Sequence, residues 1–294
     1  MRRKIHIVCV LCSILLTGNT FGQSYPRLND YWDQLYTINP ASINDDYFGT
    51  VTTSSRQQWV SYNGAPRTYL STATFYLDDY YTQFGARVLV EPKGVTQKLD
   101  MQLSYAYRLL LANDWRLNMG LGVNFQNFCY DVSELVFPAF DNPQIYDRMI
   151  FTNNINANLG FELNYFTWKI GVSSQNIISA FGAGNDLHPL TNLGYVYYRQ
   201  QNSDWVNWGG GVSVFQYSNI VQGEININAY IKKTYETDDL QIGLLYRTWH
   251  ELGLIYGMNF GPFKFRFSYD YNLGLIRYHS LGTAELMLIY KFNR

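Results

Sequence analysis

Apolar and polar residues alternate regularly along most of the chain. From residue 263 to residue 272, Phe and Tyr occupy the odd positions, whereas Lys, Arg, Ser, Asp and Asn occupy the even ones. Segments 99–109, 117–125 and 155–163 follow the same rule. Because neighbouring side chains of a strand point to opposite faces, each segment is predicted to be a β-strand with one apolar and one polar face.

A soluble β-sandwich would give the same alternation, but the length and the polar face of these segments favour a barrel in lipid. The segments run roughly ten residues or more, as a tilted transmembrane strand requires, whereas globular strands average about 5–6 residues. Their polar faces are rich in Asn, Gln, Gly and Ser, which suits a wet or narrow lumen. We therefore predict an all-β protein, a transmembrane antiparallel up-and-down β-barrel, over residues 49–294.

Fourteen such strands can be placed, an even number, as single-chain bacterial barrels have. We expect them at residues 49–60, 67–77, 80–91, 97–110, 115–129, 151–164, 167–176, 189–200, 204–217, 220–233, 238–248, 250–260, 262–273 and 279–293.

The connections between these strands fall into two classes. If both termini lie in the periplasm, every connection on the periplasmic side is short, for example Asp78-Asp79 and Gly261-Pro262. The two longest connections, near residues 131–150 and 174–189, both lie outside the cell. Short periplasmic turns and longer external loops are the asymmetry typical of outer-membrane barrels.

The N-terminus has the pattern of an export signal. Basic residues at positions 2–4 precede an apolar stretch from Ile5 to Leu16, and small residues follow at Thr20 and Gly22. We predict a Sec-type signal peptide at residues 1–22 and a multi-pass β-barrel in the cell outer membrane. Cleavage would leave Cys129 as the single cysteine, so no internal disulfide is expected. Residues 23–48 form a polar-aromatic lead-in, predicted to be a short helix or a plug in the lumen.

Composition agrees with this class of protein. Aromatic residues make up 17% of the chain, with Tyr the most frequent, which suits aromatic girdles at the two membrane interfaces. The formal net charge is −1, and nucleic-acid binding is not expected because it needs a basic surface. Charged residues on the polar faces are predicted to form a network inside the barrel: Asp100, Arg108, Arg116, Glu162, Glu224, Arg266 and Asp270.

Few residues in the sequence are candidates for catalysis or for binding a cofactor. His279 and Ser280 are adjacent, so on a strand they would point to opposite faces and could not act as base and nucleophile. Gly120 and Gly122 lack the strand–turn–helix context of a nucleotide loop and are better explained by a crowded lumen or by a bend in the barrel wall. We expect no cofactor, no metal site and no catalytic residue.

Several short motifs resemble the PorP/SprF family of type IX secretion membrane proteins. They are Asn39-Pro40, Arg56-Gln57-Gln58-Trp59, and Gly64-Ala65-Pro66. After Asn39-Pro40-Ala41 the family continues with an aromatic residue and a glycine, where this chain has Ser42 and Ile43.

This resemblance implies a non-enzymatic outer-membrane barrel of the type IX secretion and gliding-motility machinery, in contact with membrane lipid. Such proteins anchor machinery components, namely periplasmic lipoproteins or ring components, or hold a secreted adhesin at the cell surface. The motif residues could contact a partner or pack the first hairpin. A passive porin or small-molecule transporter is the main alternative, and an outer-membrane lipid hydrolase is a second one.

Overall fold

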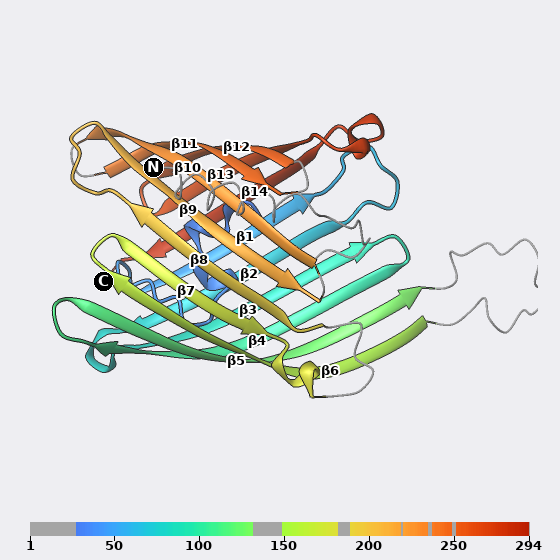
Figure 1. Cartoon of the computed structure of the whole chain (residues 1–294), viewed down its shortest axis with the longest axis horizontal. Helices are drawn as coiled ribbons and strands as arrows, with labels where there is room; N and C mark the ends of the chain where they lie inside the picture. Colours follow the sequence, from blue (N-terminus) through green and yellow to red (C-terminus); the bar gives the residue numbers. More distant parts are fainter. Residues whose placement is uncertain are drawn as a thin grey trace, which may run out of the picture.

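The computed structural model describes residues 28–131, 149–181, 189–218, 220–234, 237–248 and 251–293. Within them, fourteen antiparallel strands form one closed up-and-down barrel, in which each strand pairs with its neighbours in sequence and β14 pairs with β1 (Figure 1). The strands are β1 Gly49–Gln57, β2 Arg67–Leu77, β3 Thr82–Lys93, β4 Thr96–Leu110, β5 Trp115–Asp131, β6 Met149–Tyr165, β7 Trp168–Gln175, β8 Thr191–Arg199, β9 Val206–Tyr217, β10 Ile220–Thr234, β11 Thr237–Arg247, β12 Glu251–Phe260, β13 Phe263–Asn272 and β14 Thr283–Phe292. The predicted fold class and strand number are confirmed.

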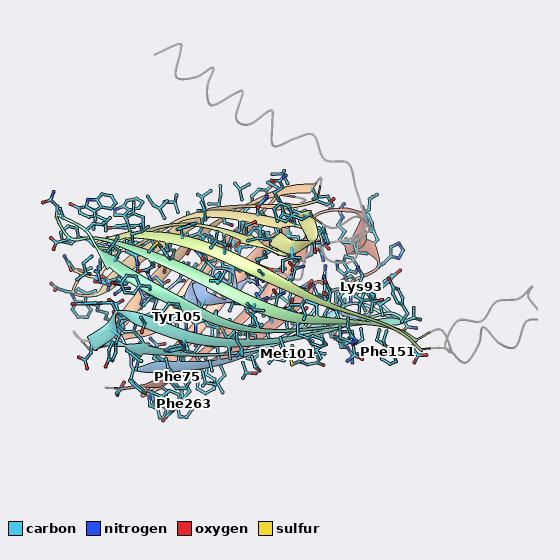
Figure 2. The ribbon with its side chains drawn as sticks, turned by 90° about the horizontal axis from the view of Figure 1, so that it is seen from below. Phe75, Lys93, Met101, Tyr105, Phe151 and Phe263 are labelled. Carbon is cyan, nitrogen blue, oxygen red and sulfur yellow. The ribbon has the colours of Figure 1, made fainter. Side chains whose placement is uncertain are left out.

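The two faces of the wall follow the alternation in the sequence. In β13, Phe267 is 46% exposed on the outer surface, while the next residue inward, Arg266, is 1% exposed. Figure 2 shows Phe75 of β2 and Phe263 of β13 projecting outward. An apolar outer face meets lipid, and the polar residues are left to solvate one another inside. Among the described residues, no helix is both long enough and apolar enough to cross a membrane.

Most strand ends lie within two residues of the prediction, and two differ by three residues or more. The first strand stops at Gln57 instead of residue 60, because Trp59 and Ser61 have positive φ angles of 48° and 74° and turn the chain. The last strand begins at Thr283 instead of residue 279, because a 3-10 turn, η6 (Leu275–Tyr278), precedes it and Gly282 has a φ of 105°. The first change lengthens the loop between β1 and β2, and the second lengthens the loop between β13 and β14.

The connections place short turns at one end of the barrel and the longest segments at the other (Figure 1). We call these the short-turn end and the long-loop end. The short-turn end includes residues 111–114, 166–167 and 261–262, and the long-loop end is where β5 ends at Asp131, β6 begins at Met149, β7 ends at Gln175 and β8 begins at Thr191. The sequence predicts that the short-turn end faces the periplasm.

Residues 28–46 run through the interior of the barrel, and we call them the lumen segment. It contains two 3-10 turns, η1 (Asp30–Asp33) and η2 (Leu35–Thr37), and its residues from 34 to 43 are all buried. Apolar side chains of the segment pack on the inner wall in one cluster: Tyr31, Trp32, Leu35 and Ile38 with Leu193, Tyr195, Tyr197 and Phe215. A small apolar core therefore sits inside an otherwise polar lumen.

The segment runs from the long-loop end towards the short-turn end. Leu28 packs against Leu70 and Leu89, which lie on β2 and β3 near the long-loop end. Ile43 packs near the opposite end, against Tyr76 and Ala106. The chain then leaves the lumen and enters β1 at Gly49.

Close packing against the wall requires glycine at Gly120 of β5. A Cβ atom there would lie 2.4 Å from the backbone nitrogen of Ala41 and 2.4 Å from the carbonyl carbon of Pro40. The predicted crowding of the lumen at this glycine is confirmed. We expect Gly120→Ala to lower the free energy of unfolding by about 1–3 kcal/mol, since backbone on both sides must shift. Thermal or urea unfolding of the protein in detergent, followed by gel mobility, would measure the change.

Gly194→Ala on β8 is the matched control. A Cβ at Gly194 would meet no atom within 4 Å, so this variant should unfold like the wild type. Equal stability of the two variants would contradict the close packing of the lumen segment on β5.

Candidate functional site: the lumen segment and its charged anchors

The first anchor of the lumen segment lies near the long-loop end, where three wall charges meet Asn29. The Arg56 guanidinium of β1 donates to Asp270 of β13 at 2.9 Å and to Glu285 of β14 at 3.0 Å. The backbone N–H of Asn29 donates to Glu285 at 2.8 Å, and its side-chain amide donates to Asp270 at 2.6 Å. The segment therefore completes a buried ion cluster that also spans the closing strands of the barrel.

A second anchor surrounds Glu224 of β10. Arg247 of β11 donates to Glu224 at 2.7 Å and also to the side-chain oxygen of Asn29 at 2.9 Å. The hydroxyl of Tyr31 and the indole N–H of Trp32 each donate to the other oxygen of Glu224 at 2.7 Å. Both carboxylate oxygens thus have partners, which is the condition for tolerating a buried charge.

Further anchors follow along the segment towards the short-turn end. Asp33 pairs with Lys264 and, at 2.6 Å, with Arg266, both on β13. Arg87 of β3 donates to the backbone carbonyl of Thr37 at 3.0 Å. Each turn of the segment is therefore tied to the wall by at least one charged side chain.

Asn39 lies at the middle of the lumen. Its side-chain amide donates to the carbonyl of Phe161 on β6 and to the hydroxyl of Tyr195 on β8, both at 3.2 Å. Tyr195 in turn donates to Glu162, which also accepts from Asn118. This family-motif asparagine thus joins the segment to a polar chain that crosses β5, β6 and β8.

The last anchor is Asp45, which accepts from Arg108 at 2.5 Å and from Arg116 at 2.9 Å. Burial raises the pKa of Asp45, but the hydrogen bond and charge of Arg108, helped by Arg116, outweigh that effect. The pKa of this carboxyl therefore lies below its ordinary value of 3.8.

The predicted internal network is present in the structure. Asp100, Arg108, Glu162, Glu224, Arg266 and Asp270 are buried, and Arg116 reaches the same network through Asp45. Sequence analysis missed the lumen-segment partners of these residues: Asn29, Tyr31, Trp32, Asp33 and Asp45. The signal that could have found them is the run of polar and aromatic residues just before the first strand, too long and too polar for a simple linker.

Of the remaining motif residues, Gln57 ends β1 and the others lie in the loop between β1 and β2. Gln57, Gln58 and Trp59 are half-buried, Gly64 is exposed, and Ala65 and Pro66 are buried. This loop pairs with the β13–β14 loop, since Val60 N–H donates to the Gly282 carbonyl at 2.7 Å and Leu281 N–H donates to the Val60 carbonyl at 2.9 Å. Asn39 and Arg56 lie inside the barrel instead, so the motif divides between the lumen and the rim.

The serine next to His279 takes part in a local turn. Ser280 donates to the carbonyl of Gly282 at 3.2 Å and accepts from its N–H at 3.0 Å, so the hydroxyl is used in a local turn. His188 and His250 lie outside the described residues. Within the described ranges, no group of three or more His, Cys, Asp or Glu could hold a metal ion.

The buried Arg56 cluster should be sensitive to loss of its cation. Arg56→Gln would leave Asp270 and Glu285 buried without their main counter-charge, and we expect a loss of about 3–5 kcal/mol in unfolding free energy. Arg67→Gln, an exposed arginine on the same hairpin, should stay within about 0.5 kcal/mol of the wild type. Urea unfolding in detergent would compare them, and equal effects would show that the Arg56 cluster does not stabilise the barrel.

Asp45 should give the barrel a defined acid sensitivity. A carboxyl whose pKa is lower in the folded than in the unfolded protein contributes stability above its unfolded pKa and loses it as the pH falls through the folded pKa. We therefore expect Asp45→Asn to be less stable than the wild type at pH 7, and the difference to shrink as the pH falls below the ordinary carboxyl pKa. Unfolding curves measured at several pH values would show the two profiles converge, whereas parallel profiles would contradict the ion pair.

Comparison with known proteins agrees with this architecture. The family model for the type IX secretion system membrane protein PorP/SprF matches residues 20–290. Among solved structures, the toluene transporter TbuX of Ralstonia pickettii is 10% identical with a TM-score of 0.52, covering 87% of this chain and 93% of that one. The monoaromatic hydrocarbon channel CymD is 9% identical with a TM-score of 0.52, covering 93% and 95%.

At these identities, the solved structures establish the barrel fold alone. A search of curated proteins finds no match. The family match extends over nearly the whole chain, including the lumen segment, the first thirteen strands and most of β14. This outer-membrane β-barrel therefore belongs to the PorP/SprF family of type IX secretion system membrane proteins.

Proposed function

We propose that this barrel is a non-enzymatic anchor of the type IX secretion and gliding machinery in the outer membrane. It would hold either machinery components on its periplasmic side or a secreted adhesin at the cell surface. The observation that carries the proposal is the lumen segment, which runs through the interior and binds the wall on several sides.

The distribution of the anchors supports a rigid body better than a pore. Asn29 binds the wall at β11, β13 and β14, Asn39 binds it at β6 and β8, and Asp45 binds it at β4 and β5. Opening a passage through the described lumen would break several of these buried charged contacts, each costly to leave unpaired. This disfavours the alternative of a passive porin.

The rim at the long-loop end offers a surface for a partner. The β1–β2 loop is fixed to the β13–β14 loop by backbone hydrogen bonds, and Tyr62 is 49% exposed beside Trp59. Aromatic side chains held on a rigid frame are frequent anchors of protein interfaces. We infer that Gln57, Gln58, Trp59 and Gly64 contact a partner here, whereas Arg56, Ala65 and Pro66 serve packing.

Co-purification from native outer membranes tests the anchoring role directly. The tagged protein would be cross-linked mildly, extracted gently and analysed for associated proteins. We expect either periplasmic lipoproteins and ring components, which would indicate the core apparatus, or one large adhesin, which would indicate a cargo-specific anchor. Recovery of the barrel alone, together with conductance in planar bilayers, would reject anchoring in favour of a porin.

Two tyrosine variants would show which end of the barrel binds the recovered partner. Tyr62→Ala alters the long-loop end, where this side chain is 49% exposed, and Tyr80→Ala alters a more exposed aromatic, at 69%, at the short-turn end. An adhesin should be lost with the first variant only, because it would bind outside the cell. Periplasmic machinery should be lost with the second only.

A further inference from the structure

Strand β6 extends beyond its neighbour β7 at the long-loop end of the barrel. Its pairing with β7 stops at Leu159, whereas its pairing with β5 continues to Met149. On the other side of this hairpin, β4 covers β5 as far as Tyr130. Within the described residues, β6 is therefore paired on one side only from residue 149 to residue 158. Figure 1 shows the β5–β6 hairpin projecting past the neighbouring strands.

The odd-numbered residues of this extension turn their backbone N–H and C=O groups towards the uncovered edge. Tyr165 and Trp168 flank the two-residue turn between β6 and β7, and the flanking residues of such a hairpin exchange both backbone hydrogen bonds. Odd-numbered residues of β6 therefore face β7, and even-numbered ones face β5. Asn153 and Ile155 thus present donors and acceptors on a side where the described residues place no strand.

A short turn, η5 (Ile177–Ala180), covers the beginning of the extension. The Asn156 side chain accepts from the backbone N–H of Ile178 at 2.9 Å and donates to the hydroxyl of Ser179 at 2.6 Å. The same side chain accepts from the backbone N–H of Ala157 at 3.0 Å. The uncovered part of the edge therefore consists of residues 151–155, and we call it the open edge.

The open edge lacks the usual protection against strand addition. Sheet proteins normally guard an exposed edge with charged side chains, proline or a bulge, because an unguarded edge pairs readily with another extended chain. Residues 151–158 contain no charged residue and no proline, and they pair with β5 without a shift in register. The amide nitrogen of Asn154 is also buried without a hydrogen-bond partner. An added strand would supply the acceptors that this edge lacks.

The open edge lies beyond the lipid-facing belt. Asn127 of β5 and Asn153 of β6 are opposite one another on the outer face, and the amide of Asn127 donates to the side-chain oxygen of Asn153 at 2.7 Å. Two amides on the outer face are costly in hydrocarbon and favourable in water. Figure 2 shows Phe151 near the end of the described hairpin. A water-soluble partner can therefore reach this edge.

A second copy of this barrel is a poor occupant of the open edge. Two copies in one membrane are related by a rotation about the membrane normal. Strands of outer-membrane barrels tilt by about 35–45°, so a twofold rotation would make two β6 strands cross at about 70–90°. Strands that cross so steeply cannot form a ladder. An extended segment of a different protein has no such restriction.

We propose that the open edge binds an extended segment of a secreted surface protein by strand addition. The inference rests on the proposed anchoring function and names the contact by which the long-loop end holds its cargo. Backbone groups of Asn153 and Ile155 would bond the added strand, which is a common mode of peptide recognition. Apolar side chains of that strand would lie beside Phe151 and Ile155, which are 59% and 63% exposed.

Two adjacent asparagines provide a matched pair of proline variants. Asn153→Pro removes an N–H from the open edge only, so its β5–β6 hairpin should resist limited proteolysis as the wild type does. Asn154→Pro removes an N–H that faces β5, opposite Gln126, and should be cleaved faster. Equal acceleration in both variants would show that the edge is already paired within the barrel, and would overturn the proposal.

Peptide binding to the full-length barrel in neutral detergent tests strand addition directly. The probe is a labelled peptide that copies residues 124–130 of β5 with Cys129→Ser, because β6 already pairs with this sequence on its other side. We expect it to bind the wild type and to bind Asn153→Pro about fivefold more weakly or worse, measured by fluorescence anisotropy. A peptide of the same composition without apolar–polar alternation is the control. The proposal is overturned if the probe does not bind, if the control binds equally well, or if Asn153→Pro has no effect.

Failure of the open edge and failure of the anchoring function can be told apart. If a surface adhesin co-purifies with Asn153→Pro as it does with the wild type, the barrel is an anchor but the open edge is not its contact. If no partner co-purifies with the wild type, anchoring itself fails, whatever the peptide does.

Discussion

In hydrocarbon, every backbone N–H and C=O must find its hydrogen-bond partner within the protein, and this requirement governs the whole structure. The chain meets it by pairing β1 with β14, from Gly49 opposite Phe292 to Gln57 opposite Ala284, so that no strand edge is left open. Arg56 and Glu285 are opposite one another in this register. Their ion pair therefore lies on the seam that closes the barrel.

Closure creates a second problem, because the inner faces of fourteen strands carry charges that must be solvated in a narrow space. The lumen segment supplies much of that solvation. Asn29 contributes a backbone N–H, an amide N–H and an amide oxygen to three wall residues, and Asp33 neutralises two cations of β13. The wall and the segment are thus mutually dependent: wall charges orient the segment, and the segment makes those charges tolerable.

Much of this barrel could be predicted from the sequence, because strand position and facing depend on local alternation. The inward placement of Glu224 and Arg266 follows from their parity alone. The partners of these residues could not be predicted, since Asp33 and Lys264 are 231 positions apart and no periodicity relates them. The positions of the two 3-10 turns in the lumen segment could not be predicted either, because these turns form against the wall and not by local propensity.

The position of Arg56 illustrates the same limit at the scale of a motif. As sequence, Arg56 and Trp59 form one continuous motif, which a partner contact or hairpin packing would explain equally well. In the fold, the positive φ of Trp59 turns the chain just after β1, so that Arg56 faces the ion cluster and Trp59 reaches the rim. One short motif thereby serves two purposes, holding the seam of the barrel and shaping the loop above it.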